Sequence, residues 1–213
     1  MTMKFYQHPL SSFCWKVSIA LYEAGIPFES VMVNLGDPAT RAEYLKISPL
    51  GKLPTLVDGG RVVNETTIIM EYLALKYPAA ASLIPKDPEE ALQVRALDRF
   101  FDLYINLGLV RVAGDRLRPE DKRDPLGIGT VLNDMKTALD IVERDMANRT
   151  FAAGEAFTMA DCSAVPPLFY AQRLIPYSPD YPNVVRYLER MQKRPAVARA
   201  IKEAEPYFHM VPL

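Results

Sequence analysis

The sequence has few of the residues that usually mark a metal site or a disulfide-linked scaffold. It contains two cysteines, two histidines and one tryptophan among 213 residues. Cys14 and Cys162 cannot supply the dense cross-links of a small secreted domain. Together with His8 and His209 they offer no spaced set of metal ligands. We therefore expect neither a disulfide framework nor a bound metal.

The chain also lacks long apolar runs and an excess of either charge. No uninterrupted apolar stretch approaches the roughly 20 residues that span a bilayer. The first ten residues, MTMKFYQHPL, lack the apolar core of a signal peptide. A net charge of −1 provides no field that would attract nucleic acid or an anionic membrane. We expect a cytoplasmic protein whose partners are neither nucleic acids nor membranes.

Residues 1–78 contain a mixture of strand and helix signals. Strands are predicted at 3–7, 28–33, 54–57 and 61–63, with helices at 12–24 and directly after the last strand. A crossover helix between the first two strands makes them parallel. The turn Asp58-Gly59-Gly60 makes the last pair antiparallel. We predict a mixed four-stranded sheet with helices packed on it.

Strand signals vanish beyond a short linker predicted at 79–88, which is rich in proline and small residues. Helices are predicted at 89–117, 130–148, from Thr158 onward, at 183–193 and at 196–205. Asp161 follows Thr158 by three residues, as in a capping box. Pro166-Pro167 is expected to kink or interrupt that helix. Residues 89–213 are therefore predicted to form an all-helical domain.

Two serines open the first predicted helix. Ser11 and Ser12 suit an ordinary N-cap, and serine is favoured there without any ligand. A helix N-terminus also carries unpaired N–H groups and partial positive charge, so it holds anions well. A ligand thiolate is such an anion, and a hydroxyl donating to its sulfur would lower the thiol pKa. Structural and catalytic roles both remain open at this point.

The residues that follow are interpreted as structural. Cys14 comes three positions after Ser11, and serine in place of a first cysteine argues against a dithiol mechanism. Cys14 is more simply a small buried residue than a reactive thiol. Trp15 is predicted to pack in the core and Lys16 to be a solvated charge.

Two further segments could bind a peptide-like ligand. Leu53-Pro54 is either an ordinary trans pair at the start of a strand or a cis pair beside a functional turn. A cis bond would let the backbone of Leu53 pair with a ligand, and Lys52 could neutralise a ligand carboxylate. Glu65 and Thr66 could hold the ammonium and carboxylate of an amino acid, or simply cap a helix.

Four ordered segments resemble the cytosolic glutathione S-transferase superfamily: SSFCWKVSIALYEAGIPFE, GKLPTLVDGG, NETTIIMEYL and FAAGEAFTMADCSA. The resemblance covers nearly the whole chain and implies a thioredoxin-like domain followed by a helical bundle domain. It implies that Ser11 activates the thiol of glutathione, that Pro54 is the family's cis-proline, and that Leu53, Glu65 and Thr66 bind the tripeptide. Ser11 and Ser12 together resemble the Ser-Ser pair of zeta-like maleylacetoacetate isomerases. This likeness leaves open which of the two hydroxyls contacts the sulfur.

The resemblance further implies a bacterial, Ser-type enzyme with theta- and zeta-like features that detoxifies a small electrophile. The expected second-substrate residues lie between the domains, although a core role suits most of them: Leu10, Tyr104, Leu107, Arg111, Tyr170 and the tail Tyr207-Phe208-His209. A homodimer is expected, with Asp98 or Asp102 as candidates to reach the neighbouring copy's ligand. A glutathione-dependent isomerase, a thiol–disulfide exchange enzyme and a non-enzymatic glutathione-binding module are the alternatives.

Overall fold

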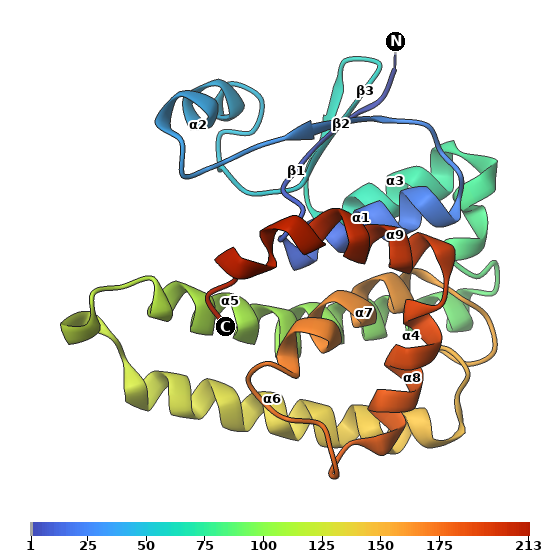
Figure 1. Ribbon diagram of the computed structural model, residues 1–213. Helices are drawn as coiled ribbons and strands as arrows, with labels where there is room; N and C mark the ends of the chain where they lie inside the picture. Colours follow the sequence, from blue (N-terminus) through green and yellow to red (C-terminus); the bar gives the residue numbers. More distant parts are fainter. Residues whose placement is uncertain (1) are drawn as a thin grey trace.

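A computed structural model describes residues 2–213 (Figure 1). The N-terminal part comprises β1 Lys4–Gln7, α1 Ser12–Glu23, β2 Glu29–Met32, α2 Pro38–Leu45, β3 Thr55–Asp58, β4 Arg61–Val63 and α3 Thr66–Lys76. The strands form one sheet in the order β2-β1-β3-β4. The β1–β2 pair is parallel and the other two pairs are antiparallel. The predicted mixed four-stranded sheet is confirmed.

The rest of the described chain is helical. Its α-helices are α4 Pro88–Phe100, α5 Leu107–Arg116, α6 Pro125–Asp145, α7 Met159–Ala171, α8 Pro182–Gln192 and α9 Pro195–Ala204. A π-helical segment, η2 Phe101–Asn106, joins α4 to α5. Short 3-10 helices occupy η1 Pro78–Leu83, η3 Glu120–Lys122, η4 Met146–Asn148 and η5 Glu205–Met210. No helix within residues 2–213 combines the length and apolarity needed to cross a bilayer.

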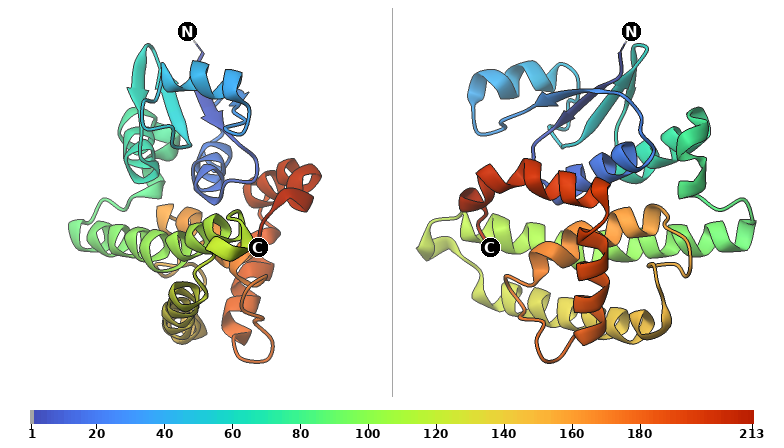
Figure 2. Two further views of the ribbon diagram at one scale, coloured as in Figure 1. Left: turned by 90° about the vertical axis from the view of Figure 1, so that its left-hand side faces the viewer. Right: turned by 45° about the vertical axis from the view of Figure 1, so that its right-hand side comes forward.

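Helix α1 lies between the sheet and the helical half, where it packs against α7 and α9 (Figures 1 and 2). Every residue from Cys14 to Leu21 is buried, because α1 has neighbours on both sides. Ala24 caps the helix, and Gly25 then takes a φ of 62°, a conformation that glycine adopts without a Cβ clash. This central position brings the start of α1 close to both halves of the molecule.

Three local predictions need correction. Helix α2 was not predicted, although Asp37 caps it through Thr40 and Pro38 occupies its first turn. Helix α6 begins five residues earlier than expected, because Asp124 caps it at Gly127. Helix α7 is not interrupted at Pro166-Pro167. Its nearly complete burial, against α1 and α4 among others, compensates for the backbone hydrogen bonds that the prolines remove.

Candidate active site

The start of α1 places two hydroxyls in different situations. The Ser11 side chain is the N-cap and accepts a hydrogen bond from the Cys14 N–H at 3.3 Å. The Ser12 hydroxyl donates to Oδ1 of Asn106, in the π-helical segment, at 2.5 Å. The hydroxyl proton of Ser11 therefore stays available to a ligand, whereas that of Ser12 is already engaged. Asn106 was not predicted, because no local pattern connects it to a residue 94 positions earlier.

The segment before β3 presents backbone groups and a cation. The Leu53–Pro54 peptide bond is cis. No hydrogen bond joins the backbone N–H or C=O of Leu53 to another residue within 2–213. The Lys52 carbonyl accepts a hydrogen bond from the Tyr44 hydroxyl at 2.5 Å, and Tyr44 also contacts the Thr55 hydroxyl at 2.7 Å. The hydroxyl of this buried tyrosine thus holds the segment in place, while the Lys52 side chain is exposed.

The start of α3 is an uncapped helix end. Glu65, at the N-cap position, has a φ of 65° and makes no side-chain capping hydrogen bond. A positive φ is unusual for a residue with a Cβ and costs about 1–3 kcal/mol, which is why such residues often mark functional sites. Thr66 is the first helical residue and is buried, and Glu65 is exposed beside it. The free N–H groups of this helix end can donate hydrogen bonds to a carboxylate.

These segments line two adjoining cavities. The first, which we call the Pro54 cavity, has a volume of about 380 Å³ and is lined by all five predicted glutathione-binding residues: Lys52, Leu53, Pro54, Glu65 and Thr66. The second, the Ser11 cavity, has a volume of about 180 Å³ and is lined by Ser11, Ser12, Leu10 and Tyr170, among others. Phe13 and Val110 line both cavities. The motifs separated in the sequence thus meet around two adjoining cavities.

The expected second-substrate residues separate into three groups. Leu10 lines the Ser11 cavity, but Leu107 lines the Pro54 cavity instead. Tyr104 and Arg111 are exposed and line neither. Phe208 also lies outside both, with its ring 5.8 Å from that of Phe169. The helical spacing that identified these residues does not show which face of each helix points toward the site.

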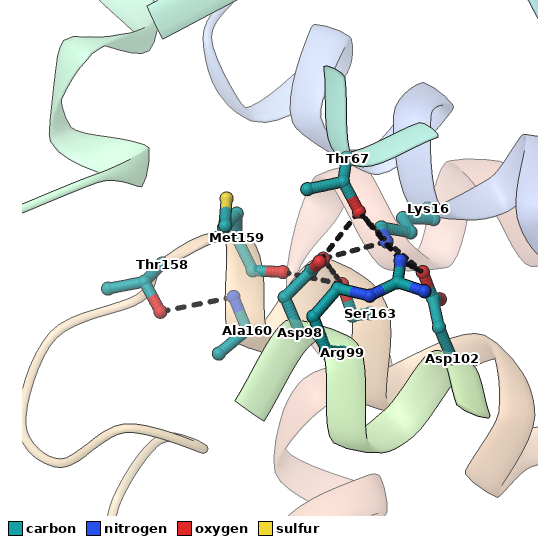
Figure 3. A network of polar contacts seen from close by, with 9 residues as sticks. All are labelled: Lys16, Thr67, Asp98, Arg99, Asp102, Thr158, Met159, Ala160 and Ser163. Atoms are coloured by element: carbon teal, nitrogen blue, oxygen red, sulfur yellow. Dashed lines mark hydrogen bonds and ion pairs between the residues drawn. The ribbon is translucent and has the colours of Figure 1, made fainter. Parts of the chain in front are cut away.

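The prediction that Lys16 is solvated is wrong. Its Nζ lies 2.7 Å from both Asp98 and Asp102 and 3.2 Å from the Thr67 hydroxyl (Figure 3). Asp98 also accepts hydrogen bonds from Thr67 at 2.7 Å and from Ser163 at 2.5 Å. We call these five residues the Lys16 cluster. It joins α1 and α3 to α4, the π-helical segment and α7, so it connects the sheet domain to the helices.

The cluster also borders the site. Asp102 and Arg99 line the Pro54 cavity, and an Arg99 nitrogen lies 3.2 Å from the Asp102 carboxylate. Burial raises the pKa of Asp102, although Lys16 acts in the opposite direction. Because Asp98 and Asp102 both pair with Lys16 of their own chain, these contacts hold both carboxylates within the molecule. This geometry gives no support to the expectation that either reaches a neighbouring copy's ligand.

Cysteine chemistry is not favoured by the geometry. Cys14 and Cys162 are both buried free thiols. Burial raises the pKa of Cys14 to about 11, despite the hydrogen bond with Ser11. A thiol in that environment is protonated near neutral pH and is a poor nucleophile. Within residues 2–213 no three His, Cys, Asp or Glu side chains cluster as metal ligands would.

A larger cavity, of about 580 Å³, lies between β2 and α9. Ser30 and Met32 line it on one side and Arg199 and Glu203 on the other. It contains none of the predicted glutathione-binding residues and neither serine at the start of α1. We therefore assign the candidate active site to the two smaller cavities, where the convergent polar groups lie.

Comparison with known proteins identifies both halves of the chain. Residues 5–81 match the family model "Glutathione S-transferase, N-terminal domain", and residues 129–195 match the corresponding C-terminal domain model. Glutathione S-transferase Z2 of Arabidopsis thaliana is 30% identical over 96% of this chain and 92% of its own length. A probable maleylacetoacetate isomerase of Caenorhabditis elegans is 30% identical over 94% of each chain.

Solved structures give the same result. A glutathione S-transferase from Methylobacillus flagellatus KT, crystallised with glutathione bound, superposes with a TM-score of 0.87 at 28% identity. The match covers 93% of this chain and 98% of that one. A second, from Methylobacterium radiotolerans in complex with glutathione sulfonate, gives a TM-score of 0.85 at 28% identity over 94% and 95% of the two chains.

Proposed function

This chain belongs to the glutathione S-transferase family, and from that premise we propose that it binds glutathione and transfers it to a small electrophile. The observation that carries the proposal is spatial. All five predicted glutathione-binding residues line the Pro54 cavity, and that cavity adjoins the serines at the start of α1. Motifs that only stabilised the fold would not have to lie around the same pair of cavities.

The chemistry of the Pro54 cavity fits the tripeptide from end to end. The unpaired backbone N–H and C=O of Leu53 suit the cysteinyl backbone, as in the addition of a strand. The uncapped start of α3 and the Thr66 hydroxyl suit the γ-glutamyl carboxylate, and Glu65 suits the neighbouring ammonium. Lys52, exposed at the far side, suits the glycyl carboxylate. This arrangement directs the cysteine sulfur toward α1.

We assign activation of the sulfur to Ser11. Its Oγ is occupied as an acceptor by the Cys14 N–H, which leaves its proton free to donate to a thiolate. Ser12 instead supports the site through Asn106. A hydrogen bond to the sulfur and the partial positive charge of the α1 N-terminus both stabilise the thiolate over the thiol. The activated sulfur then attacks an electrophile held in the Ser11 cavity, so catalysis combines thiol activation with proximity.

An isomerase activity is the second candidate. It is favoured by the adjacent Ser11 and Ser12 and by relatives named probable maleylacetoacetate isomerase in Caenorhabditis elegans and Vibrio cholerae. In an isomerisation the sulfur would add to the substrate and leave again, so glutathione would be recovered unchanged. Measuring glutathione consumption during turnover separates the two activities. Thiol–disulfide exchange is less favoured, because Cys14 is buried and protonated.

The test compares Ser11→Ala with its neighbour Ser12→Ala. Glutathione affinity is measured by calorimetry, and conjugation is measured with a generic aryl halide. We expect Ser11→Ala to bind glutathione while losing about 10- to 100-fold in kcat/KM, which corresponds to roughly 1.4–2.7 kcal/mol. Ser12→Ala should lose less, because its hydroxyl proton does not face the sulfur. Equal turnover in wild type and Ser11→Ala would remove the assigned role, and absence of glutathione binding would remove the function itself.

We also propose that two copies of the chain associate. Glu71 of α3 and Arg95 of α4 form an ion pair at 2.5 Å, which places these helices side by side. Leu75, one turn after Glu71, is 89% exposed, and Leu92, one turn before Arg95, is 61% exposed. A second copy would cover these apolar side chains. Light scattering on wild type and Leu75→Glu tests this: a dimer that the variant weakens is expected, and a monomeric wild type would contradict it.

A further inference from the structure

The turn that leads into α1 is held by both the backbone and the side chain of His8. The Ser11 N–H donates to the His8 carbonyl at 2.9 Å, which closes a four-residue turn between β1 and α1. Pro9 takes the second position of this turn, where proline is favoured. The Leu10 N–H donates to Nδ1 of the His8 imidazole at 3.2 Å. A titratable side chain is therefore part of the turn that delivers Ser11.

The part that His8 plays in this turn usually falls to asparagine, aspartate or serine. These side chains accept a hydrogen bond from the backbone two residues on, and they keep an accepting oxygen throughout the pH range near neutrality. An imidazole nitrogen accepts only while it is unprotonated. Protonation would turn Nδ1 of His8 into a donor that faces the Leu10 N–H, so this hydrogen bond would be lost. The integrity of the turn thus depends on the charge of His8.

The surroundings of His8 favour its neutral form. The side chain is half-buried, and its ring packs against that of Tyr207 in η5 with the two centroids 5.5 Å apart. Tyr207 is the titratable group of η5 that faces the ring, and η5 also carries Glu205 and His209. Burial lowers the pKa of His8 from its usual 6.5, and no charged side chain of β1, α1 or η5 contributes to this shift. The hydrogen bond from Leu10 is therefore intact at neutral pH and is lost as the pH falls below 6.5.

The position of the Ser11 hydroxyl depends on this turn. Ser11 is both the last residue of the turn and the N-cap of α1. Its Oγ accepts from the Cys14 N–H at 3.3 Å, which is a long hydrogen bond for these atoms and hence a weak constraint. The indole N–H of Trp15 donates to the Pro9 carbonyl and ties the turn to the buried face of α1. Loss of the bond within the turn would therefore loosen the hydroxyl that the sulfur requires.

We propose that His8 is a positioning residue for the thiol activation assigned to Ser11, and that protonation of its imidazole releases the turn and slows the reaction in mildly acidic solution. This inference rests on the proposed function. His8 lines neither the Pro54 cavity nor the Ser11 cavity, so it acts through Ser11 and not on either substrate. No proton passes between His8 and glutathione.

The experiment compares His8→Asn with His8→Gln. The amide oxygen of asparagine can reach the Leu10 N–H and accepts at every pH, whereas that of glutamine lies one bond further from the backbone. Both variants lose the ring contact with Tyr207, so the difference between them isolates the acceptor. At about pH 7.5 we expect kcat/KM of His8→Asn to match wild type and that of His8→Gln to be about three- to tenfold lower. At about pH 5 the wild type should approach His8→Gln, so the ratio of His8→Asn to wild type should rise by that factor.

Proton NMR of the histidine rings identifies the group that titrates. The chain has two histidines, so His209→Gln assigns the signal of His8. The ratio of His8→Asn to wild type should change at the pH at which His8 itself titrates, which we expect below 6.5. A ratio that stays constant from about pH 8 to about pH 5, or a loss in His8→Asn equal to that in His8→Gln, would overturn the role of His8 while leaving the transferase function intact. Failure of the wild type to bind glutathione in calorimetry would overturn both.

Discussion

Replacing Lys16 by methionine tests whether the buried Lys16 cluster joins the two halves of the protein. Lys16 is 1% exposed, and its Nζ lies 2.7 Å from two carboxylates that are themselves buried. Without this cation Asp98 keeps only its hydrogen bonds with Thr67 and Ser163. Asp102 keeps only Arg99, at 3.2 Å. The substitution therefore leaves negative charge in a region from which water is excluded.

The expected loss is large because the pair is broken on one side only. Removing one partner of a buried ion pair typically lowers the free energy of unfolding by about 3–5 kcal/mol. Lys46→Met is a matched control, because Lys46 lies 2.6 Å from Glu43 but the side chains are 69% and 72% exposed. Exposed pairs of that kind contribute less than about 1 kcal/mol. The difference between the two losses of stability therefore measures the effect of burying the ion pair.

Urea unfolding followed by fluorescence of the single tryptophan gives the measurement, since Trp15 is buried next to Lys16 in α1. Asp102 already has a raised pKa, and losing Lys16 raises it further. The folded variant then binds a proton more tightly than the unfolded chain, so its deficit in stability should shrink as the pH falls. Adding Asp102→Asn to Lys16→Met should recover part of the loss. A deficit below about 1 kcal/mol, equal to that of Lys46→Met, would refute the buried cluster.

Two other predictions concern the ligand and the helical half. Thr66→Val should weaken glutathione binding about tenfold in calorimetry, because a charge-assisted hydrogen bond to the ligand carboxylate is lost, and an unchanged Kd would exclude that contact. Burial raises the pKa of Asp161 to about 6 from its usual 3.8, so the folded state binds this proton more tightly than the unfolded chain. The free energy of unfolding of wild type relative to Asp161→Asn should therefore fall, by up to about 3 kcal/mol, as the pH rises from 3.8 through 6, and a parallel pH dependence in the two proteins would contradict this.

The sequence was most informative where local signals and motifs agree. The parallel first pair and the hairpin turn of the N-terminal half are encoded by residues close together in the chain, and the mixed sheet that they predict is confirmed. The capping box at Thr158 and Asp161 is likewise local, and it is present in the structure. The glutathione-binding residues predicted for the Pro54 cavity could be selected because two short motifs each carry their own chemistry.

The sequence was least informative where a residue's environment depends on distant elements. Lys16 and Asp102 are 86 positions apart, and nothing near Lys16 indicates that α1 is covered on both sides. The hydrogen bond between Ser12 and Asn106 likewise joins residues that are far apart in the sequence. The lining of the Ser11 cavity is harder still to predict, because periodicity identifies buried helix positions without distinguishing core from cavity wall.

The most direct measurement is an ultraviolet difference titration of glutathione bound to the enzyme, which reports the fraction of thiolate at each pH. We predict that the thiol of the wild-type complex has a pKa well below that of free glutathione, that Ser11→Ala moves it most of the way back, and that Ser12→Ala moves it little. A bound thiol that titrates like the free peptide, or one that Ser11→Ala leaves unchanged, would contradict the account.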